Sequence, residues 1–257
     1  MSSSDPHAQL PRTDDVAPLH YRLQAFLRPP GRRVLGLWWE VRQHNAELVP
    51  RTGPVLLASN HVGIMDGPLL IGFSPRPTHA LIKSEMFRGQ TSRFFTAMGQ
   101  IPLHRFQTDR HAVDLALRAL RDDQVVAIYP EGSRGDGEFA AIKPGAAYLA
   151  LVSGAPIVPV ATFGTRAPGR SVDWVPPRGA RLDVVYGEPL RVTAIPWPRR
   201  RDVVAELTRR LQERLIAHVA TAQQLTGAGL PGPAPDEEGR EPGSISVLDE
   251  EHHGRTA

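Results

Sequence analysis

The chain has 257 residues, enough for one large α/β domain, and 41% of them are hydrophobic, which suffices for a core. It contains no cysteine, which excludes disulfides, thiolate metal sites and a cysteine nucleophile. The formal charge is +3, but seven acids against two arginines give residues 223–257 a charge of −5, which leaves +8 on residues 1–222. A basic body favours anionic partners such as phosphorylated ligands, membrane surfaces or nucleic acid.

The first helical pattern covers residues 19–45. The preceding residues 1–18 are polar, lack the apolar core of a signal peptide and are expected to be disordered. Two short helices are predicted on either side of Arg28-Pro-Pro-Gly31, because proline interrupts helical hydrogen bonding. The second of these is amphipathic, with apolar residues at helical spacing: Val34, Leu37, Trp38 and Val41.

This helical region has two interpretations. It carries Trp38 and Trp39 among several arginines, the composition of an amphipathic anchor on an anionic bilayer surface. The arginines are Arg28, Arg32, Arg33 and Arg42. An ordinary helix packed on the domain fits the same pattern. No apolar run reaches the roughly 18 residues of a bilayer-spanning helix, so we expect any membrane contact to be peripheral.

Residues 46–222 alternate between short apolar runs and helical stretches, which is typical of an α/β domain. The predicted strands are 54–59, 79–83, 100–103, 124–129, 156–161 and 181–186, and the predicted helices are 67–73, 90–98, 108–121, 143–153 and 202–222. We therefore expect one α/β domain with a mixed, largely parallel sheet flanked by helices, preceded by the short N-terminal helices. Residues 223–257, rich in glycine and proline and then in acids, predict a disordered tail.

The most informative segment is Ser59-Asn-His-Val-Gly-Ile-Met-Asp66, directly after a predicted strand. Open α/β sheets bind ligands beyond the carboxyl ends of their strands. We expect His61 in the turn and Asp66 at a helix start, where it can reach one imidazole nitrogen and leave the other basic. The pair is then a candidate general base with its orienting acid. A plain N-cap aspartate beside a polar loop histidine is the alternative.

Two other strand ends carry polar groups. Arg105 follows one predicted strand and suits a phosphate, because guanidinium matches phosphate oxygens bidentately. The segment Glu131-Gly-Ser-Arg134 follows another; its glycine allows a ligand close to the main chain, and its serine and arginine can donate to an anion. A tight turn with an exposed ion pair is the alternative there. No histidine shows metal-ligand spacing, so we expect no metal.

Together with the rigid apolar segment 155–160, these motifs occur in the order found in the glycerolipid acyltransferase family, which the chain resembles over about residues 50–189. The namesake of that family makes phosphatidic acid from 1-acylglycerol 3-phosphate. The resemblance implies that His61 is the general base and Asp66 its partner. It implies acceptor-phosphate contacts at Arg105, Glu131, Gly132, Ser133 and Arg134, and a place on the acyl-donor side for Pro159.

Three further positions bear on the substrate. Lys143 is a basic candidate for contact with donor or acceptor phosphates, although it belongs to no motif. Gly63 stands where the family frequently has serine, and His104 where an acid or amide is common. Both departures lie near the expected acceptor site, so they leave the identity of the acceptor open.

The resemblance implies an acyltransferase of phospholipid biosynthesis that uses no cofactor. Its donor would be acyl-coenzyme A or acyl carrier protein, its acceptor 1-acylglycerol 3-phosphate or a related lysophospholipid, and its location the cytoplasmic side of the membrane, as a peripheral protein without a nucleic-acid partner. Another lysolipid or a glycolipid is an alternative acceptor. A thioesterase or other hydrolase in which the histidine activates water, and a non-catalytic lipid- or phosphate-binding module, are alternatives of other classes.

Overall fold

A short apolar strand, β2 (Val55–Ser59), lies at the centre of the computed structural model, and all of its residues are buried. The structure describes residues 13, 15–104 and 109–235. β2 pairs in parallel with β5 (Val125–Ile128) on one side and with β6 (Ile157–Phe163) on the other. Continuous apolar runs of this kind are what parallel strands covered on both faces require.

The described strands form one seven-stranded sheet in the order β1-β7-β6-β2-β5-β3-β4. β3 (Thr78–Lys83) and β4 (Ile101–Leu103) extend it on one side, β7 (Arg181–Tyr186) and β1 (Glu40–His44) on the other. β7 is antiparallel to β6, and the other described pairings are parallel. The predicted mixed, largely parallel sheet is confirmed. The carboxyl ends of β2, β5 and β6 consequently lie at one edge.

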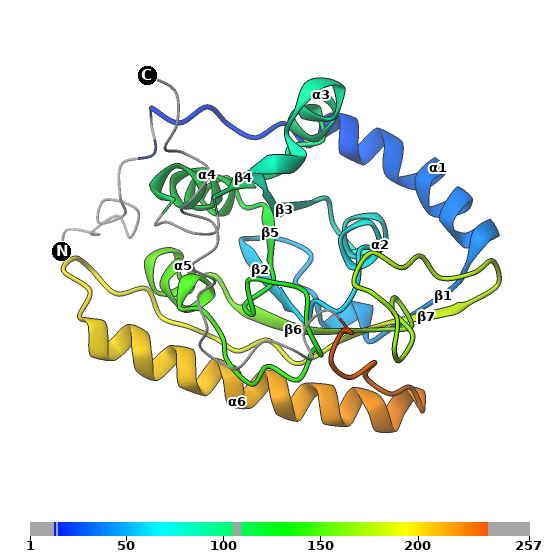
Figure 1. Ribbon diagram of the computed structural model, residues 1–257. Coiled ribbons are helices and arrows are strands. Elements are labelled where there is room, and N and C mark those ends of the chain that lie inside the picture. Colours follow the sequence, from blue (N-terminus) through cyan, green and yellow to red (C-terminus); the bar gives the residue numbers. More distant parts are fainter. Residues whose placement is uncertain (1–12, 14, 105–108, 236–257) are drawn as a thin grey trace, which may run out of the picture.

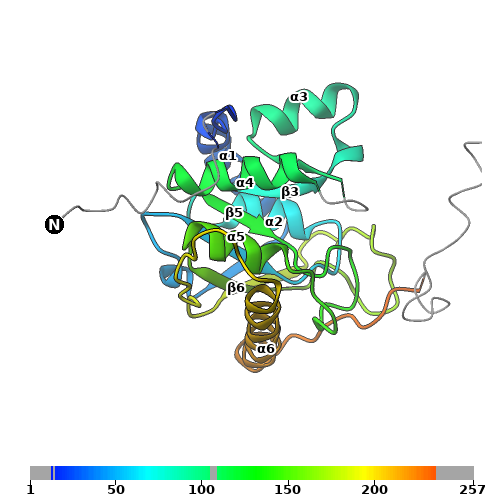
Figure 2. The same cartoon turned by 90° about the vertical axis from the view of Figure 1, so that its left-hand side faces the viewer.

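Helices cover both faces of the sheet (Figure 1). One face carries α4 (Arg110–Arg121), α5 (Gly145–Ser153) and α6 (Arg201–Thr226), and the other carries α1 (Arg22–Trp38) and α2 (Asp66–Phe73). α3 (Gly89–Ala97) lies at the β4 end, on the same side of the molecule as α1 (Figure 2). The short 3-10 helices η2 (Ala46–Leu48) and η3 (Ser84–Met86) connect elements.

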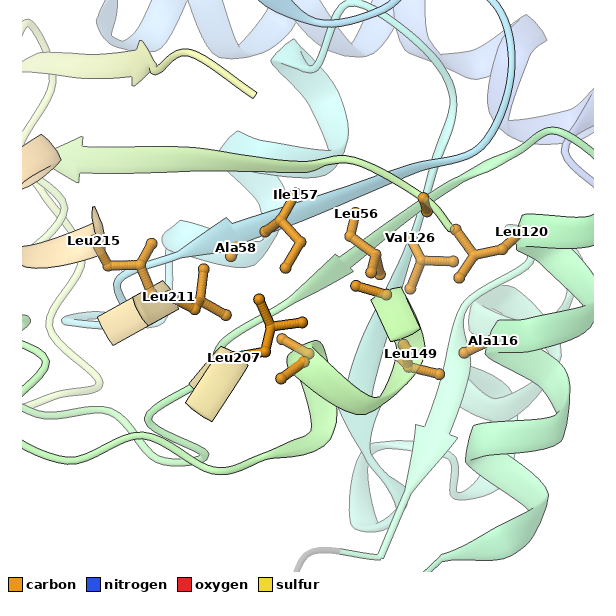
Figure 3. Close-up of a cluster of buried hydrophobic side chains, with 14 of the residues drawn as sticks. Leu56, Ala58, Ala116, Leu120, Val126, Leu149, Ile157, Leu207, Leu211 and Leu215 are labelled. Atoms are coloured by element: carbon orange, nitrogen blue, oxygen red, sulfur yellow. The ribbon is translucent and has the colours of Figure 1, made fainter. Parts of the chain in front are cut away.

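The larger core lies between the sheet and helices α4, α5 and α6, as Figure 3 shows. Leu56, Val126 and Ile157 of the three central strands face leucines of the helices. Leucines four residues apart place one stripe of α6 against this core: Leu207, Leu211 and Leu215. Burial of each such side chain contributes about 1.5–3 kcal/mol. The strand ends are therefore fixed by a rigid frame.

The N-terminal region differs from the prediction. A single helix, α1, continues through Arg28-Pro-Pro-Gly31 with Pro29 and Pro30 inside it. Both prolines are exposed, so water can donate hydrogen bonds to the carbonyl groups that lose their N–H partners. The predicted second helix ends at Trp38, and the next residues form strand β1 on the open edge of β7. The polar sequence of β1 has no alternating pattern that marks it as a strand.

The boundaries predicted for the disordered ends, at residues 18 and 223, also differ from the structure. Helix α6 extends to Thr226, so the boundary expected at residue 223 falls inside a helix. Beyond it, Leu230 packs against the core and Ala234 is fully buried. Near the other end, the carbonyl groups of Thr13 and Val16 accept hydrogen bonds from Arg118. Short stretches predicted as tails are thus held on the domain by burial and hydrogen bonds.

Candidate active site

The candidate site lies where the loops after β2, β5 and β6 meet. The first loop carries His61, the second Glu131 and the third Thr165. A main-chain hydrogen bond from Gly135 N to His61 O, 2.8 Å long, joins the first two loops. This is the edge of the sheet at which the strand-end argument placed a ligand.

His61 and Asp66 form the predicted pair. Imidazole Nδ1 lies 2.9 Å from Oδ2 of Asp66, which is fully buried at the first residue of α2. Because an ionised carboxylate only accepts hydrogen bonds, Nδ1 carries the hydrogen between them. Nε2 is then the nitrogen with a free lone pair, and the side chain of His61 is 21% exposed. The pair has the arrangement that a general base requires.

Asp66 is held by neutral donors. Its Oδ2 accepts from the main-chain N–H groups of Val62 (2.6 Å) and Gly63 (2.8 Å), and its Oδ1 from the hydroxyl of Thr165 (2.5 Å). Val62 and Gly63 lie before α2, and Thr165 lies after β6. The N-cap residue of α2 is Met65, so the interpretation of Asp66 as a plain N-cap is wrong. Within the described residues, His61 is the sole ion-pair partner of this carboxylate.

Glu131 holds the loop that carries His61. Its Oε2 accepts from the main-chain N–H of His61 at 2.8 Å, and its carboxylate also accepts from the main-chain N–H of Phe139. Burial raises the pKa of Glu131 to about 7, and the charges of Asp136 and Asp66 add to that rise. The structure thus brings Glu131 to the site as a link between two loops, facing N–H groups.

The turn after Glu131 presents cationic groups. Gly132 has a φ of +77°, a conformation that favours glycine, and a Cβ there would lie within 2.6–2.9 Å of the end of the Lys143 side chain. Lys143 therefore covers the turn, beside the exposed Ser133. Arg134 donates to Val172 O at 3.1 Å and lies 2.5 Å from Asp173 Oδ1, so its guanidinium is tied to the loop after β6.

Two predicted site residues are not placed there by the structure. Arg105 lies outside the described residues. The residue before it, His104, contacts Asp109 Oδ2 through Nδ1 at 2.8 Å. Pro159 lies inside β6, is buried and pairs with Ala58, and so forms part of the sheet.

Three residues at the site were missed. The ring of Tyr129 stacks on His61, Thr165 contacts Asp66, and Arg166 donates to Val62 O (2.7 Å) and Gly135 O (2.9 Å). Thr165 and Arg166 follow the carboxyl end of β6, so their position after a predicted strand could have marked them as site candidates. Gly63 is explained by the same loop, because a Cβ there would lie 2.8 Å from the carbonyl oxygen of Thr165.

The arrangement provides a basic imidazole nitrogen beside a turn with a lysine and a serine. It suits proton removal from a hydroxyl that belongs to an anionic molecule. Among the residues that the structure describes, no group of three or more potential metal ligands occurs.

Comparisons with known proteins point to one family. Residues 40–162 match the family model described as Acyltransferase. Over 130 residues the chain is 33% identical to the 1-acyl-sn-glycerol-3-phosphate acyltransferase beta of Homo sapiens. The matched segment covers 49% of this chain and 46% of that protein. It is 27% identical over 124 residues to the 1-acyl-sn-glycerol-3-phosphate acyltransferase of Borreliella burgdorferi, covering 47% and 50%. The chain thus spans about half the length of these relatives.

The fold also has a solved counterpart. The crystal structure of the 1-acyl-sn-glycerophosphate acyltransferase PlsC from Thermotoga maritima matches with a TM-score of 0.57 and 23% identity, covering 76% of this chain and 80% of that one. These matches confirm the resemblance to glycerolipid acyltransferases. The matched residues 40–162 contain both His61 and Asp66.

Proposed function

We propose that this chain is an acyltransferase that moves a fatty acyl group from a thioester to the free hydroxyl of 1-acylglycerol 3-phosphate or a related lysophospholipid. The observation that carries the proposal is the pair of His61 and Asp66, with Nε2 left basic at the sheet edge, inside the segment that matches the acyltransferase family. The names of the relatives supply the acceptor class.

The reaction follows from the geometry of the pair. Nε2 of His61 removes the proton of the acceptor hydroxyl while its oxygen attacks the thioester carbonyl. Asp66 stabilises the imidazolium that forms, since its carboxylate is already held in place by main-chain hydrogen bonds. The tetrahedral intermediate then expels the thiolate of coenzyme A or of acyl carrier protein, and His61 returns the proton to the sulfur. General base catalysis of this kind contributes about 10²–10⁴-fold.

The cationic turn would receive the phosphate of the acceptor. We assign this role to Lys143, Ser133 and Arg105, and to Arg134 once it exchanges the exposed Asp173 carboxylate for phosphate oxygens. Glu131 would act on the acceptor indirectly, by fixing the main chain at His61. Pro159 would act on the donor side through the loop that follows its strand.

Membrane contact is proposed for helix α1. Five apolar residues on one face of it are exposed: Leu23, Phe26, Val34, Leu37 and Trp38. Met86 of η3 and Phe94 of α3 are exposed as well. Helix α3 lies on the same side of the molecule as α1 (Figure 2). An apolar face flanked by exposed arginines is the composition of an interfacial helix. No described helix is long and apolar enough to span a bilayer.

The residues of this face differ from those first expected. Trp39 is buried, and its Nε1 donates to Pro176 O at 2.9 Å. Arg28 donates to Ser74 O, so it also points into the protein. Of the predicted tryptophan pair, Trp38 is the one that can reach lipid. Because thioester donors are cytoplasmic, we propose contact with the cytoplasmic leaflet.

Vesicle co-sedimentation tests the membrane contact. The double variant Phe26→Ser/Leu37→Ser should bind phosphatidylglycerol-containing vesicles at least several-fold less than the unmodified chain. The matched control Ile216→Ser/Leu225→Ser removes two exposed apolar side chains of α6 and should bind as the unmodified chain does. Equal loss in both variants would contradict a role for α1.

Acyl transfer from an acyl-coenzyme A to 1-acylglycerol 3-phosphate tests the activity, with His61→Ala in parallel. We expect a diacylated product that disappears in the variant. Free fatty acid as the sole product would favour the hydrolase. Lipid binding without turnover, with both thioester donors tried, would favour the non-catalytic module.

A further inference from the structure

Tyr129 lies directly against the imidazole of His61. The two ring centroids are 4.0 Å apart and the ring planes differ by 18°, so the rings are stacked. Tyr129 follows the last residue of β5, and it also packs against the apolar cluster that contains Leu57 and Val160. The aromatic ring is therefore held by the sheet on which it rests, and it presents one face to the candidate base.

The hydroxyl of Tyr129 contributes little to this arrangement. It is buried and has no hydrogen-bond partner among the described residues. Burial, and secondarily the charge of Asp66, raise the pKa of Tyr129 well above its ordinary value, so the group stays neutral. A buried hydroxyl without a partner is unfavourable relative to a carbon-bound hydrogen of similar size. The ring is thus the part of the side chain that can serve His61.

His61 needs a restraint that Asp66 does not supply. The bond from Nδ1 to Asp66 fixes one atom of the imidazole, and Glu131 fixes the main-chain nitrogen. The torsion that tilts a histidine ring is broad, so one hydrogen bond leaves the direction of Nε2 loosely defined. A parallel aromatic ring at 4.0 Å restricts that tilt.

The stack also distinguishes the two charge states of His61. The face of an aromatic ring carries partial negative charge and attracts a cation placed over it. Neutral imidazole gains less from this contact than the imidazolium that forms when Nε2 takes a proton. The contact therefore strengthens during the reaction, and an interaction of that kind affects kcat more than KM.

We propose that the ring of Tyr129 is a positioning residue for His61, which fixes the direction of Nε2 and stabilises the imidazolium. The proposal rests on the proposed acyl transfer. It assigns the effect to the aromatic ring and none of it to the hydroxyl.

The test compares Tyr129→Phe, which keeps the ring, with Tyr129→Leu, which removes it, in the full chain. With acyl-coenzyme A and 1-acylglycerol 3-phosphate, Tyr129→Leu should lower kcat about 5- to 30-fold. KM for the acceptor should change less than about twofold, since the contact that strengthens during the reaction is the one with His61. Tyr129→Phe should match the unmodified chain. Tyr148→Leu, at a partly buried tyrosine of α5, is the matched control and should leave kcat unchanged.

A second measurement reads the stack without any turnover. The carbon-bound ring protons of His61, assigned in the proton NMR spectrum by their loss in His61→Gln, experience the ring current of Tyr129. They should shift downfield in Tyr129→Leu and stay in place in Tyr129→Phe. If Tyr129→Leu does not fold, Tyr129→Met takes its place, because methionine adapts to irregular gaps.

Each outcome decides a separate point. An equal loss of kcat in Tyr129→Phe and Tyr129→Leu would assign the effect to the hydroxyl and overturn the proposal. So would a folded Tyr129→Leu with unchanged kcat, or histidine resonances that do not respond to removal of the ring. Absence of acyl transfer in the unmodified chain, with the expected NMR shifts present, would overturn the proposed function and leave the stack intact.

Discussion

Among the histidine–aspartate pairs that the structure describes, two combine a short contact with a buried aspartate and differ in their surroundings. Nδ1 of His61 lies 2.9 Å from Asp66, and Nε2 of His44 lies 2.7 Å from Asp183. Both aspartates are buried. Asp183 also binds the cation Arg181 at 2.8 Å, whereas Asp66 meets main-chain N–H groups and hydroxyls within the described residues.

The difference lies in how each carboxylate is compensated. Asp183 has a permanent counter-charge in Arg181, in addition to its contact with His44. Asp66 has none besides His61 in the described part of the chain, so an imidazolium at His61 supplies the missing positive charge. The pairs also differ in place, since His44 lies on the edge strand β1 and Asp183 on its neighbour β7. A short distance between histidine and aspartate therefore does not by itself identify a base.

Exchanging each aspartate for its amide gives the largest contrast. Asp66→Asn should lower kcat about 10²–10⁴-fold, because an amide nitrogen cannot accept the hydrogen bonds that now fix the carboxylate and the imidazole tautomer. Asp183→Asn should leave kcat within about twofold and lower the melting temperature, since it removes the counter-charge of Arg181. Comparable losses of activity in both variants would remove the distinction between the pairs.

Glu131, which holds the loop of His61, should make the stability of the folded chain depend on pH. Its pKa is about 7 in the folded chain against an ordinary 4.5, so the folded state holds the proton longer. As pH rises from about 4.5 to about 7, the unfolded state releases that proton first, and the free energy of unfolding falls by about 1–3 kcal/mol. Glu131→Gln keeps an oxygen that can accept from His61 N, but it has no proton to release, so its free energy of unfolding should not fall in this way.

The measurement is urea denaturation of both proteins across that pH range. Glu131→Gln should become more stable than the unmodified chain as pH rises, with a constant difference above about pH 7. Its kcat should stay within a few-fold, because the hydrogen bond to His61 N remains possible. A stability difference that does not change with pH would contradict the buried, loop-linking position of Glu131.

Thr165 gives the smallest expected effect. Thr165→Val removes the hydroxyl that donates to Asp66 Oδ1, which leaves a buried carboxylate oxygen with one donor fewer. We expect a loss of about 1–3 kcal/mol in the free energy of unfolding, with a modest decrease in kcat. Thr208→Val is the control, since that hydroxyl donates only to a carbonyl one turn back in α6. Equal losses for both would show that Asp66 does not depend on Thr165.

The sequence predicted the parts of the site that lie next to a marked strand end. β2 and β5 are short and apolar, so His61 and Glu131 were each placed directly after a strand end, and the structure shows that these two strands are neighbours. The helix start at Asp66 followed from the proline in its first turn, and the stripe of leucines in α6 followed from periodicity. Local patterns carry this information because period and turn chemistry act over a few residues.

The rest depends on contacts between distant residues. Thr165 lies 99 positions from Asp66 in the sequence. The stack of Tyr129 on His61 depends on how the ends of β2 and β5 are aligned with each other. The hydrogen bond from His61 N to Glu131 was missed for the same reason, since it joins two different loops. Strand β1 was missed because tertiary pairing with β7 decides its conformation.

We propose that His61, compensated by Asp66, is the base, while the similar pair on β1 and β7 is structural. The most direct measurement is kcat for acyl transfer from acyl-coenzyme A to 1-acylglycerol 3-phosphate by His61→Gln and His44→Gln, side by side. We expect the kcat of His61→Gln to fall at least about 10²-fold and that of His44→Gln to stay within about twofold. A folded His61→Gln that retains activity, or a His44→Gln that loses as much, would contradict it.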